Sequence, residues 1–159
     1  MSFKLDVDRL AKDELMYEVK CRGIKVSDTD NVDSLRKNLR SALLVEKNAS
    51  FTQPFSFTGI IGDELVICES NLDEIGTSLA AFSSEIRKLE TKICHCYNRL
   101  ENILTDDADL IGKRSSLIKT LMELIDDYKT KSKSLQSEER GFQELIASIL
   151  TGSHHIAFK

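Results

Sequence analysis

Apolar residues recur at alternating intervals of three and four along residues 65–103, and this repeat constrains the fold more than any other feature of the sequence. Such a repeat places its members along one side of an α-helix and is typical of coiled coils. The series consists of Leu65, Cys68, Leu72, Ile75, Leu79, Phe82, Ile86, Leu89, Ile93, Cys96, Leu100 and Ile103. We therefore expect one long helix that needs an equally long partner.

A second series follows the short acidic stretch TDDAD, residues 105–109. Its members are Leu110, Leu117, Leu121, Leu124, Tyr128, Leu135, Phe142, Leu145 or Ile146, and Ile149, interrupted by the polar residues Arg114, Ser132 and Glu139. The two segments span about 41 and 44 residues, or roughly 60 to 66 Å each at 1.5 Å per residue. Near-equal lengths and a short polar connection predict an all-α fold in which residues 64–150 form a long antiparallel coiled-coil hairpin.

Further apolar residues lie beside the second series and widen its stripe. They are Leu104, Ile111, Ile118, Ile125 and Ile146. A stripe of this width is expected where a third or fourth helix packs. The N-terminal region, the segment that joins the two regions, or another copy of the chain could supply this neighbour.

The first 47 residues carry a shorter helical pattern. We expect a first helix to end at Gly23, because glycine readily adopts the left-handed conformation that follows a helix C-terminus. A second helix is expected from Val32 to about Lys47. Together they predict a small helix–loop–helix module.

Pro54 and two glycines interrupt the helical pattern between the two regions. We interpret this segment as a linker whose Phe51, Phe55 and Phe57 dock onto a helical surface. The predicted organisation is a module at residues 1–47, a Phe-rich linker at 48–63, the hairpin at 64–150 and a tail at 151–159.

Charge and composition exclude several classes of protein. The 159 residues carry a net charge of −4, and 41% of them are apolar. Residues 1–63 hold ten basic and ten acidic residues, and residues 64–159 hold twelve and sixteen, so neither half has the positive excess typical of non-specific nucleic-acid binding. The N-terminus lacks the apolar run of a secretory signal, and no stretch has 18 uninterrupted apolar residues. We expect a cytoplasmic or nuclear protein without a transmembrane segment.

No set of residues predicts catalysis, a cofactor or a metal ion. On a helix, Cys94 and Cys96 point about 200° apart and cannot hold one ion together, so the cysteines are interpreted as reduced thiols. No histidine has the spacing of a nucleophile–base pair, and GIIGDE lacks the Lys and Ser/Thr of a P-loop. The carboxylates of DELMYE and the polar residues of ICHCYNRLENI, among them His95, Asn98 and Arg99, are interpreted as solvated helix exteriors.

One group of basic residues is a candidate for contact with nucleic acid. Its members are Lys20, Arg22, Lys25, Arg36, Lys37 and Arg40. Six positive charges on one face could bind phosphates. Asp28, Asp30 and Asp33 lie close by in the sequence and would oppose such binding, so an ordinary charged surface is the alternative.

Residues 10–43 resemble the SAP-type helix–extended-loop–helix motif. LAKDELMYEVKCRGI ends in the RG plus aliphatic residue found at the end of that family's first helix, and NVDSLRKNLRSAL carries the Leu-Arg pair of the second. The loop has DTDN in place of the family's usual glycine and lysine. The resemblance implies a small helical module and, in that family, DNA binding.

A larger part of the chain, roughly residues 5–105, is similar to the N-terminal, matrix-like region of Gag proteins from invertebrate LTR retrotransposons. The similarity lies in KDELMYEVKCRGI, VDSLRKNLRSALLVE, GDELVICESNLDEI and KICHCYNRLENI, in this order. In that family the region precedes a capsid domain and often a CCHC zinc knuckle, and neither is recognisable in this sequence. The resemblance implies a truncated or co-opted structural protein.

These observations together favour a non-enzymatic, Gag-like assembly protein that acts through coiled-coil self-association. Its expected partner is a second copy or another helical protein. The alternative is a DNA-binding or chromatin-binding protein that uses the SAP-like module for contact and the coiled coil for dimerisation. A third hypothesis is an adaptor that binds an amphipathic helix of another protein.

Overall fold

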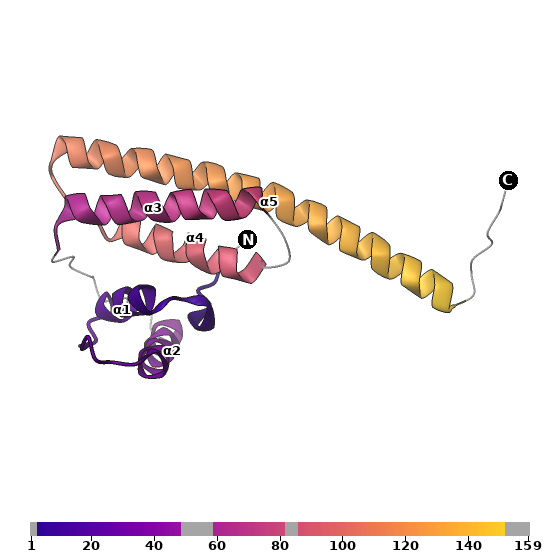
Figure 1. The fold of residues 1–159 in the computed structure, drawn as a ribbon, viewed down its shortest axis with the longest axis horizontal. Helices are drawn as coiled ribbons and strands as arrows, with labels where there is room; N and C mark the ends of the chain where they lie inside the picture. Colours follow the sequence, from indigo (N-terminus) through magenta and orange to yellow (C-terminus); the bar gives the residue numbers. More distant parts are fainter. Residues whose placement is uncertain (1–2, 49–58, 82–85, 152–159) are drawn as a thin grey trace.

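A computed structural model describes residues 3–48, 59–81 and 86–151, and gives only the backbone at residues 86 and 87. Every regular element in these ranges is helical, as the sequence predicts. The elements form two parts, an N-terminal unit of residues 3–48 and a bundle of three helices (Figure 1). None of the described helices is both long enough and apolar enough to cross a membrane.

The N-terminal unit consists of a short 3-10 helix, η1 (Val7–Arg9), and the helices α1 (Lys12–Lys20) and α2 (Val32–Asn48). The chain turns after α1 at Gly23, whose φ of 76° lies in the left-handed region, as expected from the sequence. The side chain of Asn31 caps α2 by accepting a hydrogen bond from the amide of Ser34 at 2.8 Å. Six apolar residues form the core of this unit: Val7, Leu10, Leu15, Val19, Leu35 and Leu39.

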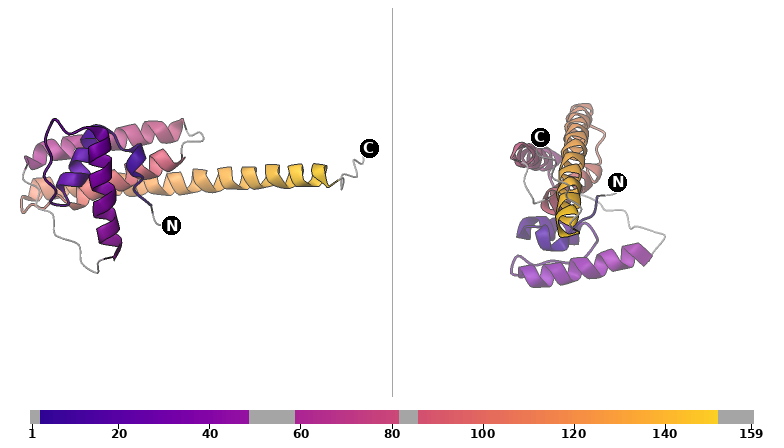
Figure 2. Two further views of the ribbon diagram at one scale, coloured as in Figure 1. Left: turned by 90° about the horizontal axis from the view of Figure 1, so that it is seen from below. Right: turned by 90° about the vertical axis from the view of Figure 1, so that its right-hand side faces the viewer.

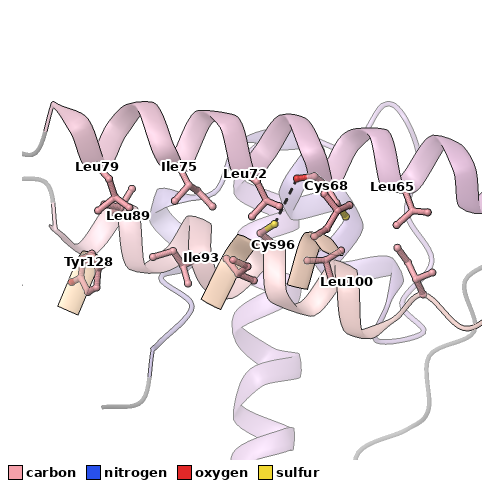
Figure 3. Packing of buried hydrophobic residues seen from close by; sticks show 13 residues of the cluster. Leu65, Cys68, Leu72, Ile75, Leu79, Leu89, Ile93, Cys96, Leu100 and Tyr128 are labelled. Carbon is pink, nitrogen blue, oxygen red and sulfur yellow. Dashed lines mark hydrogen bonds between the residues drawn. The ribbon is translucent and has the colours of Figure 1, made fainter. Parts of the chain in front are cut away.

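The bundle consists of α3 (Ile61–Ala80), α4 (Ile86–Glu101) and α5 (Ala108–Leu150). Helices α3 and α5 lie side by side and run in the same direction, and α4 packs against both in the opposite direction (Figure 1). The Nζ atom of Lys131 on α5 donates to the carbonyl oxygen of Leu79 near the end of α3, in keeping with the parallel arrangement. Leucine and isoleucine side chains from α3 and α4 interdigitate, with Tyr128 of α5 closing one end of the core (Figure 3).

The prediction of one continuous helix over residues 64–103 is wrong. The segment forms α3 and α4, which fold back on each other, and together with α5 they replace the predicted two-helix hairpin. The heptad pattern could not reveal this reversal, because it records only which side of a helix faces a core. Folding α4 back onto α3 keeps the same residues inside.

Most residues predicted to form a helical interface lie in the three-helix core. Leu65, Leu72, Ile75, Leu79, Leu89, Ile93, Leu100, Ile103, Leu117, Leu121 and Tyr128 are buried, and Leu110, Leu124 and Leu135 are partly buried. Phe82 and the side chain of Ile86 lie outside the described residues. Ile118 and Ile125 also pack against this core, because α5 contacts two helices rather than one.

The C-terminal half of α5 extends beyond the bundle (Figures 1 and 2). This helix has 43 residues, whereas α3 has 20 and α4 has 16, so both neighbours end while α5 continues. Ser132 is its last buried residue. Phe142 and Ile149, which were predicted to pack within the chain, are 63% and 57% exposed.

The N-terminal unit lies beside the bundle, with α1 facing α4 and α2 on the outer side (Figures 1 and 2). Most of the predicted Phe-rich linker, including its three phenylalanines, lies outside the described residues, and so does the tail from residue 152 onward.

Candidate functional site

A polar interface joins the N-terminal unit to the bundle. Nζ of Lys92 on α4 donates a hydrogen bond to the carboxylate of Glu14 on α1. One turn further along both helices, Nδ1 of His95 lies 2.6 Å from Oε1 of Glu18. The exposed fraction is 0% for Glu18 and 1% for His95. Two charged or polar pairs are therefore sequestered between α1 and α4.

Glu18 is the centre of this interface because Arg22, His95 and Asn98 approach its carboxylate, and the thiol of Cys21 lies 3.9 Å from Oε2. Nη1 of Arg22 donates to Oε2 at 2.6 Å, His95 lies against Oε1, and Nδ2 of Asn98 is 3.5 Å from the same oxygen. Burial disfavours the ionised carboxylate, but the hydrogen bond and charge of His95, together with Arg22, outweigh this cost and lower the pKa of Glu18. Because an ionised carboxylate only accepts, Nδ1 of His95 supplies the proton of their hydrogen bond.

A second polar cluster extends the interface to α3. Arg99 on α4 donates to both carboxylate oxygens of Glu64 on α3, at 2.6 and 3.1 Å. The guanidinium group of Arg99 also lies 4.3 Å from the ring centroid of Tyr17 on α1, an arrangement that favours a cation–π interaction. Nδ2 of Asn102 donates to the hydroxyl of Tyr17 at 3.2 Å. Arg99 therefore connects three helices.

The interpretation of DELMYE and ICHCYNRLENI as solvated exteriors holds for Asp13 and Glu101, which are exposed, but it is wrong for four other residues. Glu14, Glu18, His95 and Arg99 are all buried, because α4 is covered on two sides. Its apolar side packs against α3 and α5, and its polar side contacts α1. Matched spacing of charges was the available signal. Two acids of α1 lie four residues apart, and Lys92, His95 and Arg99 follow one another on α4 at intervals of three and four. The sequence alone does not show that α1 and α4 meet.

Nε2 of His95 is buried and has no hydrogen-bond partner within the described part of the chain. In the described ranges, no three His, Cys, Asp or Glu side chains gather in a group that could hold a metal ion. Burial raises the pKa of Cys21, Cys68 and Cys96 to about 12 and that of Cys94 to about 11, so these thiols are protonated at neutral pH.

The six basic residues considered for nucleic-acid contact fall into two groups, arginines that lie near carboxylates and lysines that are exposed. Arg22 is paired with Glu18 and Glu46, Arg36 lies 3.9 Å from carboxylate oxygens of both Asp8 and Asp33, and Arg40 is paired with Asp8. Lys20, Lys25 and Lys37 are exposed. Carboxylates thus offset the charge of all three arginines, and the predicted patch of six positive charges is much weaker than its sequence indicates.

A shallow hollow of about 420 Å³ lies between η1 and the bundle. Charged residues of both signs line it, namely Lys4, Asp6, Asp8, Arg40 and Glu90, beside Leu5 and Val7. Arg40 and Asp8 pair with each other across its wall. This mixture has neither the apolar lining nor the convergent polar groups typical of a small-molecule site.

The strongest candidate for function is an exposed apolar face on the projecting part of α5. It consists of Phe142, Leu145, Ile146 and Ile149, which are between 40% and 63% exposed, and Leu150 at its end, which is 80% exposed. Intervals of three and four place the first four on one side of the helix. Contiguous apolar surface of this kind marks an interaction site more often than isolated exposed residues do. We call residues 142, 145, 146 and 149 the α5 face.

No protein-family model matches this chain, and neither the curated proteins nor the solved structures include a match to it.

Proposed function

We propose that this protein is a non-enzymatic assembly protein whose copies associate through the α5 face. The observation that supports the proposal is the uncovered apolar stripe on a helix that continues well past the bundle. Pairing between copies would be of the coiled-coil type. A cytoplasmic or nuclear location belongs to the same proposal.

The stability of the projecting part of α5 supports the proposed association. Residues 133–150 extend roughly 27 Å at 1.5 Å per residue, and they have almost no buried side chains. Helical segments of this length are marginal in water unless an apolar face is packed. Covering the α5 face would both stabilise the projecting helix and remove its apolar surface from water.

The expected affinity is modest. Burial of one Phe, Leu or Ile side chain contributes about 1.5 to 3 kcal/mol, and association must offset the loss of translational and rotational freedom. Four such residues on each helix are enough for a weak, concentration-dependent complex rather than an obligate one. High local concentration, as in a lattice of an assembled particle, would strengthen it.

The resemblance to Gag proteins agrees with an assembly role. It covers roughly residues 5–105, which correspond to the N-terminal unit, α3 and α4. The α5 face lies outside that range, so the proposed contact does not depend on the resemblance.

Sedimentation velocity over a concentration series tests the proposal. We expect the wild-type protein to shift from monomer toward a larger species as its concentration rises to about 200 µM, the range in which weak complexes form. The double variant Leu145→Glu, Ile149→Glu should remain monomeric, because it places charges on the α5 face without touching the bundle.

The matched control is Leu44→Glu, Val45→Glu, which changes two residues of α2 that are 61% and 66% exposed. This variant should associate like the wild type. A wild-type protein that stays monomeric throughout, or association that survives in the α5 variant, would contradict the proposal.

A further inference from the structure

We infer that two copies pair through their α5 helices in antiparallel orientation, about a two-fold axis that passes between Leu145 and Ile146. The inference rests on the proposed function and adds the partner and its geometry. It comes from the symmetry of the α5 face. Phe142 and Ile149 lie equally far from the midpoint of that face, one on each side.

This symmetry makes the face complementary to itself. In an antiparallel pair centred at the midpoint, Phe142 lies opposite the partner's Ile149, and Leu145 lies opposite the partner's Ile146. The two remaining contacts repeat these by symmetry, so every apolar residue of the face meets another apolar residue. Two-fold pairs of identical chains require such self-complementarity.

Charge favours the antiparallel orientation over the parallel one. In a parallel pair in register, Glu138 and Glu139 would face the partner's Glu138 and the partner's Glu139, and like charges in close pairs repel. Antiparallel pairing places both acids beyond the end of the partner's helix, since Leu150 lies opposite residue 141. The acids of the two copies then lie far from each other.

The bundle leaves room for this arrangement. Its last buried residue on α5 is Ser132, and the overlap of two antiparallel helices covers residues 141–150. Residues 133–140 therefore separate the partner's helix from the bundle. The two bundles lie at opposite ends of the pair and do not compete for space.

The α5 face also continues an interface that already exists. Leu117, Leu121 and Tyr128 lie on the side of α5 that α3 and α4 cover. At 100° per residue, Phe142, Ile146 and Ile149 lie on nearly the same side. The partner's helix thus packs against the same apolar side of α5, beyond the ends of α3 and α4. Ten overlapping residues extend roughly 15 Å, which is small for a stable dimer and fits a weak one.

Distances between spin labels test the orientation. Single cysteines would be placed at the exposed positions Lys133→Cys or Gln143→Cys, in a background in which Cys21, Cys68, Cys94 and Cys96 are alanine and whose helicity matches the wild type. Antiparallel pairing predicts a separation of about 40 Å for position 133, from 25 residues at 1.5 Å each, and under about 20 Å for position 143.

Each outcome separates the inference from the proposed function. A short distance at position 133 as well as at 143 would show parallel pairing, which overturns the inference and leaves self-association intact. Absence of a dipolar signal at position 143, at concentrations where sedimentation gives dimers, would place the contact elsewhere and overturn both. If sedimentation gives only monomers, the proposed function itself fails.

Discussion

The carboxylate of Glu18 on α1 lies 2.6 Å from Nδ1 of His95 on α4, and neither side chain is exposed to solvent by more than 1%. This pair attaches the N-terminal unit to the bundle. Glu14 with Lys92 and Tyr17 with Asn102 lie on the same surface of α1. The two apolar cores are thus distinct, and they are joined by these polar contacts together with Phe3, which packs against the bundle core and the ring of Tyr128.

Substitution Glu18→Gln should destabilise the protein by about 3 kcal/mol, because breaking a buried ion pair leaves its partner charge without compensation. The cost is at the lower end of the usual range because Arg22 retains Glu46 as a second partner. Chemical denaturation measures the change. Asp13→Asn, on the exposed side of α1, is the matched control and should alter the free energy of unfolding by no more than about 0.5 kcal/mol.

The stabilising effect of Glu18 should depend on pH in the acid range. Its pKa is lower in the folded protein than its ordinary value of about 4.5, because His95 and Arg22 favour the ionised form more than burial disfavours it. A lowered pKa stabilises the fold at pH values above the ordinary pKa, and this stability is lost as the pH falls through the folded-state value. The difference in unfolding free energy between wild type and Glu18→Gln should therefore shrink as the pH falls below about 4.5. A difference that grows on acidification would show that Glu18 is not ionised in the fold.

Leu72→Ala should destabilise the bundle by about 2 to 5 kcal/mol, since it opens a cavity among the side chains of α3, α4 and α5. Leu72 is 4% exposed and lies in the middle of the core (Figure 3). Val66→Ala on the same helix removes apolar atoms at a position that is 56% exposed, and its effect should stay below about 0.5 kcal/mol. Equal effects of the two substitutions on the thermal midpoint would contradict the assignment of this core.

Duplex DNA should not bind measurably at about 50 mM salt, where electrostatic contacts are strongest. The reason is that Arg22, Arg36 and Arg40 already face carboxylates. Fluorescence anisotropy of a labelled duplex provides the measurement. Binding that weakens with salt and disappears in the triple variant Arg36→Ala, Lys37→Ala, Arg40→Ala would instead favour the DNA-binding alternative.

Local patterns in the sequence predicted local structure well. Gly23 adopts the left-handed conformation, and the second helix begins at Val32 as expected and ends at Asn48, one residue beyond the predicted end. The inward side of each bundle helix was also evident from its heptad pattern. These features depend on backbone preferences and periodicity, and residues close together in the sequence determine both.

Contacts between segments far apart in the chain could not be predicted from the sequence. The reversal between Ala80 and Ile86 leaves the heptad pattern unchanged, so one helix and two helices look the same in sequence. Glu18 and His95 resemble ordinary surface residues until α1 and α4 are known to meet. Likewise, the apolar pattern that ends at Ile149 does not indicate whether the helix that packs against it belongs to the same chain or to another copy.

Hydrogen–deuterium exchange at low and high protein concentration tests the role of the α5 face most directly. If copies associate there, the backbone amides of residues 142–149 should exchange more slowly at high concentration, whereas those of residues 65–79 in α3 should be unchanged. If exchange across residues 142–149 is equally fast at both concentrations while the protein forms larger species, the α5 face does not mediate association.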